Sequence, residues 1–237
     1  MFSYERDFST IADALATFAA TDTPQTSTGA PSAGCAENPQ NATHSTAANL
    51  RVLVAAGKAD VPFSAAWKAA CDSRQAQNAA FSLPAPEKLA FLPQDAWDET
   101  LYSADFLFIR GEDSLSRACL SGKPFVWHAY PQSEMYHLVK VRALLDRMEP
   151  FFSTENFRLI RDYWLWYNGD EPLAENGAQT ATGAQNATNH DYDSRTALLE
   201  ILSRYDEMQK SFRAFSKNLI KNGNLAEHLM TFIEEIV

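Results

Sequence analysis

Cysteine is scarce in this chain of 237 residues, with Cys35, Cys71 and Cys119 as the full set. An odd, scattered set without Cys-x-x-Cys spacing suits neither a disulfide framework nor a zinc site, so we expect free thiols in a reducing compartment. Long apolar runs are missing as well. No stretch approaches the roughly 18 residues of a membrane-spanning helix, and no apolar segment follows a charged start as in a signal peptide. We therefore expect a cytoplasmic protein without a membrane partner.

Basic residues are also few, because 20 Lys and Arg face 30 Asp and Glu and leave a net charge of −10. A chain of this charge without a local basic patch repels a nucleic-acid backbone, which argues against a nucleic-acid partner. Large apolar residues are nearly absent from two tracts, 21–49 and 171–194. Such tracts cannot bury enough surface to offset the entropy of ordering, so we predict two disordered insertions.

The most informative stretch, residues 88–132, alternates apolar runs with helical patterns. The apolar runs predict strands at 89–92, 106–109 and 125–127. Helices are predicted between them, from 95 to about 104 and from 114 to about 121. Strands that alternate with helices form parallel sheets with crossover connections. The predicted fold class is α/β, a Rossmann-like parallel sheet with flanking helices.

The other predicted elements are a strand at 1–4, a helix at 11–20, a strand at 50–55, and helices at 64–73, 133–149, 152–167, 195–221 and 225–236. Asn224 is the expected N-cap of the last helix. Aromatic residues recur at three-to-four spacing in the helix at 152–167, which favours core packing over a carbohydrate platform. His128 and His137 have no metal-ligand partner at suitable spacing, so each is interpreted as a surface histidine.

Three polar loops follow the strands of the central stretch. In an open parallel sheet the ligand lies beyond the carboxyl ends of the strands, so Pro93-Gln94, the turn 110–114 and residues 128–132 should face one crevice. The turn opens a helix whose free N–H groups suit a diphosphate. Arg110 adds a cation with a bidentate fork, and Ser114 adds a hydroxyl. This pattern predicts a nucleotide-sugar pocket.

The residues of this stretch narrow the prediction further. They read Phe-Leu-Pro-Gln at 91–94, Phe-Ile-Arg-Gly-Glu-Asp-Ser at 108–114, Gly-Lys-Pro-Phe-Val-Trp at 122–127 and Tyr-Pro-Gln at 130–132. In combination they resemble the EarP family, bacterial protein-arginine rhamnosyltransferases that modify elongation factor P. The resemblance implies the C-terminal half of a GT-B glycosyltransferase, and residues 2–5 look like the first strand of that half.

The resemblance also implies how the chain is organised. A GT-B enzyme needs two Rossmann-like domains of roughly 150 to 200 residues each, for which this chain is too short. We therefore expect residues 1–237 to form one donor-binding domain with the two insertions, and the N-terminal acceptor and catalytic domain to be absent.

The family's donor contacts carry over to positions of this sequence. The implied dTDP-rhamnose contacts are Phe2, Tyr4, Phe91, Gln94, Trp97, Arg110, Glu112, Asp113, Ser114 and Tyr130. Phe2 and Tyr4 would lie beside the thymine, Phe91 and Trp97 would form apolar walls, and Gln94 would read the base edge. Arg110, Asp113 and Ser114 would surround the diphosphate and sugar. Trp97 stands where the family has Phe, which keeps a stacking face.

Each assignment has an ordinary structural alternative. Tyr4 equally suits a core strand, and Tyr130 a packing position at a strand end. Glu112 and Asp113 suit the first turn of a helix, where negatively charged side chains interact favourably with the helix dipole. With the whole motif present, we favour a supporting catalytic role for Glu112 and expect the general base in the missing domain.

The implied reaction transfers L-rhamnose from dTDP-β-L-rhamnose to an arginine of elongation factor P with inversion, with neither a metal nor a cofactor. One alternative is a truncated, non-catalytic nucleotide-sugar-binding module. Another is a GT-B enzyme that uses a different nucleotide sugar, such as a UDP-sugar transferase or epimerase.

Overall fold

The computed structural model describes residues 1–21, 50–169 and 193–236. The N-terminal part contains α1 (Ser9–Thr21), β1 (Leu53–Ala55), α2 (Asp60–Gln77) and β2 (Glu87–Leu89). The central part contains α3 (Gln94–Ser103), β3 (Leu107–Arg110), α4 (Glu112–Ser121) and β4 (Phe125–His128). Next come η2 (Ser133–Met135), α5 (Tyr136–Met148), η3 (Glu149–Phe151), α6 (Thr154–Tyr167), α7 (Ser194–Ser203), α8 (Tyr205–Lys221) and α9 (Leu225–Ile236).

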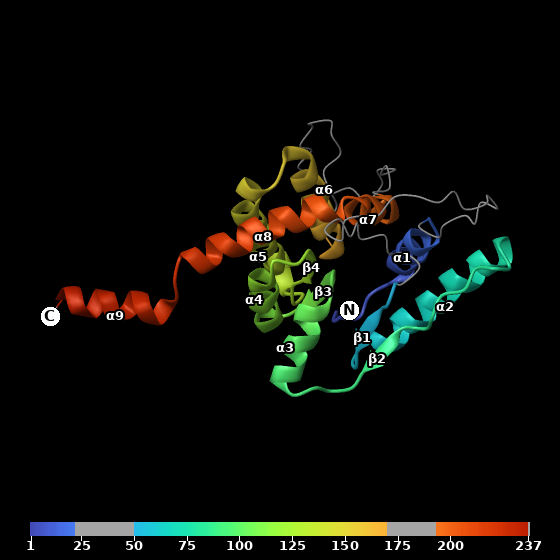
Figure 1. The fold of residues 1–237 in the computed structure, drawn as a ribbon, viewed down its shortest axis with the longest axis horizontal. Coiled ribbons are helices and arrows are strands. Elements are labelled where there is room, and N and C mark those ends of the chain that lie inside the picture. The colour runs from blue at the N-terminus through green and yellow to red at the C-terminus, as the bar shows by residue number, and fades with distance from the viewer. Residues whose placement is uncertain (22–49, 170–192, 237) are drawn as a thin grey trace, which may run out of the picture.

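The strands form two parallel pairs, β1 with β2 and β3 with β4. The opening residues lie between the pairs, because the Met1 carbonyl accepts from Ala55 N–H at 2.9 Å and Phe2 N–H donates to the Phe108 carbonyl at 2.7 Å. The order across the sheet is therefore β2, β1, residues 1–3, β3, β4 (Figure 1). Residues 1–3 are the first extended segment along the chain and β3 the fourth. The strand order reverses between them, which makes this the topological switch point of the sheet.

The core is built around β4, whose residues are all buried. Phe125 packs between Trp164 of α6 and Phe212 of α8, with ring centroids 5.1 Å apart in both cases. Trp164 Nε1–H also donates to the Phe125 carbonyl at 3.1 Å. The prediction that the aromatic helix packs into the core is confirmed, since Phe157, Ile160, Tyr163, Trp164 and Tyr167 are buried.

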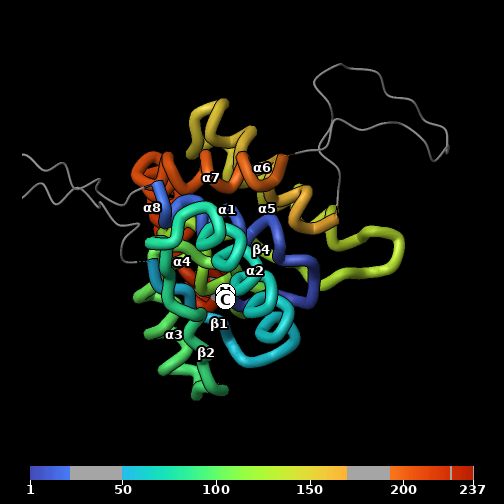
Figure 2. Tube along the Cα trace, turned by 90° about the vertical axis from the view of Figure 1, so that its right-hand side faces the viewer, coloured from blue at the N-terminus to red at the C-terminus, as the bar shows by residue number. Residues whose placement is uncertain are grey.

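Two predicted elements were wrong in detail. The strand expected at 89–92 lies at Glu87–Leu89, because its partner β1 ends at Ala55 and the chain turns away at Gly57, with φ of 146°. The single helix expected at 195–221 is divided into α7 and α8 at Arg204. The Arg204 guanidinium donates to Glu155 Oε1 at 2.7 Å and Asn156 Oδ1 at 3.2 Å, which fixes the break against the start of α6. As a result α7 packs on α1 and α6 while α8 packs on α4 (Figure 2).

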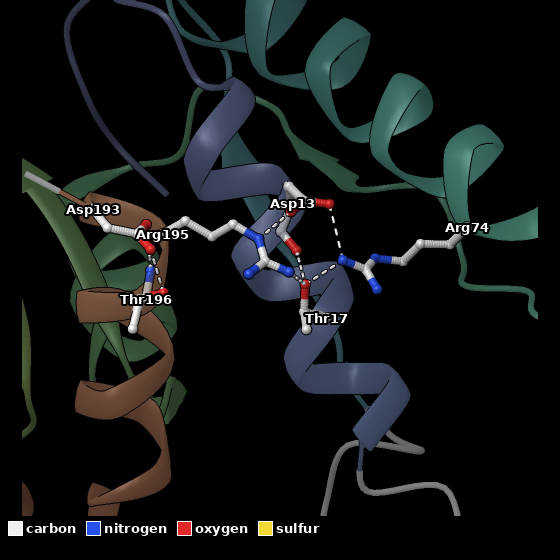
Figure 3. Close-up of polar contacts among 6 residues, drawn as sticks. All are labelled: Asp13, Thr17, Arg74, Asp193, Arg195 and Thr196. Carbon is white, nitrogen blue, oxygen red and sulfur yellow. Dashed lines mark hydrogen bonds and ion pairs between the residues drawn. The ribbon is translucent and has the colours of Figure 1, made fainter. Parts of the chain in front are cut away.

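Polar side chains join α1 to the helices on either side of it (Figure 3). Arg74 of α2 donates to Asp13 Oδ1 at 2.9 Å, and Arg195 of α7 pairs with the other oxygen of the same carboxylate. Thr17, one turn further along α1, accepts from Arg195 at 2.8 Å. Burial alone would raise the pKa of Asp13, but the hydrogen bonds from Arg195 and Arg74 lower it below its usual value. Asp13 is thus the shared counter-ion of two arginines.

We expect Asp13→Asn to lower the free energy of unfolding by about 2 kcal/mol, because two partly buried guanidinium groups lose the carboxylate that they share. The pKa of Asp13 is depressed by folding, so this stabilisation is present above the unfolded pKa of about 3.9 and is lost as pH falls below it. Urea unfolding at pH 7 and pH 3 measures both effects. Asp72→Asn, which removes the exposed Lys68–Asp72 pair, is the matched control and should change stability by less than about 0.5 kcal/mol.

The C-terminal helix α9 extends away from the rest of the domain (Figure 1). Its start is capped as predicted, with Asn224 Oδ1 accepting from Glu227 N–H at 2.9 Å. None of the helices in the described part of the chain is long and apolar enough to cross a membrane. The two predicted insertions fall almost entirely outside the described residues.

Candidate functional site

An arginine held between two aromatic rings lies at the switch point of the sheet. Arg110 ends β3, and its Cζ lies 4.4 Å from the ring centroid of Phe2 and 4.8 Å from that of Tyr4. Cations within about 6 Å of an aromatic centroid are attracted to the ring face. Phe2 and Tyr4 therefore hold the guanidinium where the strands end, and they belong to the segment beside β3.

Two more aromatic residues extend this cluster. Trp97 of α3 meets Phe2 edge to face at 5.0 Å, and Tyr130, beyond β4, meets Tyr4 edge to face at 5.5 Å. Phe2, Tyr4 and Trp97 are half-buried, and Tyr130 is 60% exposed. The opening segment, α3, the end of β3 and the loop after β4 each contribute a side chain to this cluster.

The helix N-terminus beside Arg110 is open to an anion. Gly111 makes the turn with φ of 71°, α4 begins at Glu112, and no side chain caps this end of the helix. The Gly111 carbonyl accepts from Trp127 Nε1–H at 3.0 Å, which ties the turn to β4. Free N–H groups and the positive end of the helix dipole suit a phosphate. Ser114 lies in the first turn and is buried.

The two acidic residues of the turn have basic partners. Glu112 pairs with Lys140 of α5 at 3.3 Å, and Asp113 pairs with Arg117 at 2.5 Å. Neither carboxylate is paired with Arg110 in any contact of the described residues, so the Arg110 charge is held by rings rather than by an acid. This arrangement leaves the guanidinium able to bind an anionic ligand.

Phe91 and Gln94 stand apart from the aromatic cluster. Phe91 is 98% exposed in the loop after β2, beyond the point where that strand ends. Gln94 begins α3, and its amide donates to Asp98 Oδ1 at 2.7 Å. Of the predicted contacts, the structure brings together Phe2, Tyr4, Trp97, Arg110 and Tyr130.

Tyr4 keeps its proton at neutral pH. Burial is the main cause that raises the pKa of its phenol, and the nearby charge of Glu112 adds to it, while Arg110 opposes both. The Tyr4 hydroxyl oxygen lies 3.9 Å from the position that a side-chain Cβ would take at Gly111. A neutral phenol beside Arg110 and the start of α4 is a further hydrogen-bond donor for an anion.

The interpretation of His128 and His137 as surface residues was wrong. They are 6% and 4% exposed, because β4 is buried on both faces and α5 folds back over its end. Burial, with the charges of Arg6, His137 and Arg110, lowers the pKa of His128 to about 3. His137 accepts from Gln132 N–H at 3.3 Å through Nδ1, and its Nε2 lies 3.0 Å from the Asn168 carbonyl, which holds the loop that carries Tyr130.

Sequence patterns did not predict that Ser3 and Tyr167 lie next to the candidate site. Ser3 Oγ lies 2.8 Å from both His128 Nδ1 and the Tyr167 hydroxyl, beneath the aromatic cluster. The one signal in the sequence is position, since Ser3 stands between two predicted ligand contacts and His128 directly follows a predicted strand. Which polar groups meet in the interior is set by packing and not by sequence spacing.

Two shallow hollows of the described residues, one on α9 and one between α6 and α7, are lined by none of the predicted site residues. Within ranges 1–21, 50–169 and 193–236, no group of three or more His, Cys, Asp or Glu side chains is arranged to hold a metal ion.

The parallel sheet and its flanking helices define a Rossmann-like α/β domain, with an arginine at the switch point. The chain matches the family described as "Elongation-Factor P (EF-P) rhamnosyltransferase EarP" over residues 35–234, and it belongs to this family. The predicted family and the predicted α/β fold are thereby confirmed.

Similar proteins include two named "Protein-arginine rhamnosyltransferase". The one from Neisseria meningitidis is 45% identical over 87 residues, 37% of this chain and 23% of that protein. The one from Pseudomonas aeruginosa is 37% identical over 86 residues, 36% of this chain and 23% of that protein. These matches therefore span about a quarter of the length of the curated relatives.

A solved structure has the same fold across this whole chain. It is described as "Structural basis for EarP-mediated arginine glycosylation of translation elongation factor EF-P". The superposition has a TM-score of 0.58 with 20% sequence identity and covers 100% of this chain and 60% of the other.

Proposed function

We propose that this chain is the donor-binding part of a protein-arginine rhamnosyltransferase, the C-terminal half of a GT-B enzyme, and that its ligand is dTDP-β-L-rhamnose. The observation that carries the proposal is the Arg110 guanidinium, held between Phe2 and Tyr4 beside the uncapped start of α4. A fixed cation and free helix N–H groups at the switch point are what a nucleoside diphosphate requires. Family membership supports the choice of sugar and base.

The site residues divide into groups by their chemistry. Arg110, Tyr4 and the α4 N-terminus would bind the diphosphate, with Tyr130 adding a phenol. Phe2 and Trp97, whose ring centroids are 5.0 Å apart, offer an apolar face for the thymine. Gln94 begins α3, the helix that carries Trp97, and Phe91 precedes it in the loop. Glu112, Asp113 and Ser114 would reach the sugar from the first turn of α4. Stacking would supply affinity for the base, and the amide of Gln94 would distinguish thymine from other bases by hydrogen bonds to its edge.

The reaction proposed for the whole enzyme is displacement of the diphosphate by an arginine nitrogen of elongation factor P, with inversion and without a metal or cofactor. The bond between the anomeric carbon and the phosphate oxygen breaks as the carbon–nitrogen bond forms, and the arginine proton passes to a carboxylate. The residues described here supply the leaving-group side, because Arg110 and the helix N-terminus stabilise the departing charge. We expect the carboxylate that faces the acceptor in a facing domain, because Glu112 and Asp113, the two acids beside Arg110, pair with Lys140 and Arg117.

A panel of nucleotides tests the donor. We expect dTDP and dTDP-rhamnose to raise the melting temperature more than UDP, GDP, ADP or CDP, because a ligand at 100 times its Kd stabilises the folded state by about 2.7 kcal/mol. Thermal denaturation at one fixed nucleotide concentration is the measurement.

The same panel distinguishes the alternatives. A larger shift with UDP or UDP-sugars would assign the site to a GT-B enzyme with another donor. Equal shifts with all nucleoside diphosphates would mean that the site recognises only the diphosphate. A dTDP-specific shift fits both the enzyme and a non-catalytic binding module, which the transfer assay described in the Discussion separates.

A further inference from the structure

The segment that carries Phe2 and Tyr4 is anchored by the residue between them. Successive side chains of an extended segment point to opposite faces, so Phe2 and Tyr4 face Arg110 while Ser3 points away from it. Ser3 is 2% exposed, and its hydroxyl lies 2.8 Å from His128 Nδ1 and 2.8 Å from the Tyr167 hydroxyl. One buried hydroxyl thus ties the segment to β4 on one side and to α6 on the other.

The partners of Ser3 are themselves fixed. Asn168, next to Tyr167, brackets His128 with two hydrogen bonds: its amide donates to the Trp127 carbonyl at 2.8 Å and accepts from Ala129 N–H at 2.8 Å. Arg6 lies over the Tyr167 ring at 4.1 Å and donates to the Tyr167 carbonyl. The anchor of Ser3 is therefore a rigid part of the domain and not a mobile side chain.

His128 connects this anchor to the arginine site. It is paired in register with Arg110 across β3 and β4, and its ring meets Tyr4 edge to face at 5.2 Å. Arg6, Arg110 and His137 are the charged or titratable groups whose fields act on it, while Ser3, Tyr4 and Tyr167 contact it directly. Together with burial they keep the imidazole neutral. A neutral ring can pack against Tyr4 without repelling the Arg110 guanidinium beside it.

We infer that Ser3, held by His128 and Tyr167, is a positioning residue that sets Phe2 and Tyr4 against Arg110 and so presents the guanidinium to an anionic ligand. The identity of that ligand rests on the proposed function, whereas the positioning itself does not. Loss of the Ser3 hydroxyl removes the side-chain anchor between Phe2 and Tyr4, while the backbone hydrogen bonds of Met1 to Ala55 and of Phe2 to Phe108 remain. The two rings, Tyr4 above all, would then be held less firmly against the guanidinium.

The test compares Ser3→Ala with Ser216→Ala. Ser216 is also buried, at 5% exposed, and its hydroxyl donates to the Leu120 carbonyl at 2.8 Å, at the far end of α4 from the site. Both variants lose one buried hydroxyl and should lower the melting temperature. Only Ser3→Ala should weaken dTDP-rhamnose binding, by about 3- to 10-fold in titration calorimetry well below the melting temperature. Equal effects of the two variants on affinity would overturn the inference.

A second measurement does not depend on the ligand. The Nε–H resonance of Arg110, assigned by its absence in Arg110→Ala, should carry a ring-current shift from Phe2 and Tyr4. This shift should diminish in Ser3→Ala and persist in Ser216→Ala, and its persistence in Ser3→Ala would contradict the inference. If the unaltered chain fails to bind dTDP-rhamnose but the shift diminishes as expected, the positioning role stands and the proposed function fails. If Ser3→Ala does not fold, Tyr167→Phe is the substitute, because it removes the hydrogen bond between Ser3 and Tyr167 and keeps the one between Ser3 and His128. It should lower the affinity for dTDP-rhamnose and the ring-current shift of Arg110 by smaller amounts.

Discussion

Arg110→Ala should weaken binding of dTDP-rhamnose by about 1.5 to 3 kcal/mol, which is roughly 10- to 150-fold in Kd. The substitution removes a charge-assisted contact to the diphosphate, the type of hydrogen bond with the largest net contribution. Arg110 is half-buried, and the contacts it loses in the unliganded chain are those with Phe2 and Tyr4. The melting temperature of the Arg110→Ala variant without ligand should therefore differ little from that of the unaltered chain. Titration calorimetry and thermal denaturation measure the two quantities.

Two further variants make this experiment specific. Arg110→Lys keeps the charge but lacks the planar fork that stacks on rings and binds two phosphate oxygens. The affinity of this variant for dTDP-rhamnose should therefore lie between those of the unaltered chain and Arg110→Ala. Arg51→Ala removes an exposed arginine that pairs with Glu87 at 2.6 Å on the β1–β2 side of the sheet, and it should leave binding unchanged. Collapse of the unliganded fold in Arg110→Ala would make Arg110 a structural residue and remove the main support for the donor site.

The chain alone should bind dTDP-rhamnose but transfer no rhamnose. The proposed donor contacts, the aromatic cluster, Arg110 and the start of α4, all belong to this chain, and Tyr130 among them is 60% exposed. Positioning of two reactants in a closed site contributes ~7 to 11 kcal/mol to lowering a barrier, and the proposed function assigns that contribution to a facing domain. Glu112 is not a substitute, because it lies on the donor side and pairs with Lys140 at 3.3 Å.

Mass spectrometry of elongation factor P after incubation with the chain and dTDP-rhamnose measures transfer directly. The positive control is the protein-arginine rhamnosyltransferase of Neisseria meningitidis under the same conditions. A rhamnose increment produced by this chain alone would mean that the catalytic base lies among its own residues. If a separately expressed N-terminal half restores transfer, the chain is a part of an enzyme; if no such half restores it, the non-catalytic module is the better description.

Much of the fold follows from local patterns that the sequence displays. The apolar runs at 106–109 and 125–127 placed β3, β4 and the helix α4 between them to within about two residues. The errors arose where a neighbour in space decides the outcome. The strand β2 ends at Leu89 because β1 offers no partner beyond Ala55, and the helix break at Arg204 depends on Glu155, which is distant in the sequence.

The sequence by itself determined the family and the α/β class, because motif spacing and strand–helix alternation are local properties. Tertiary structure alone decided that Arg110 is held by Phe2 and Tyr4 rather than by Glu112 or Asp113. It also decided that His128 is buried and neutral beside Ser3 and Tyr167. The physical reason is that charge pairing and desolvation depend on which groups come within a few ångströms of one another, and for residues more than 100 positions apart only packing sets that distance.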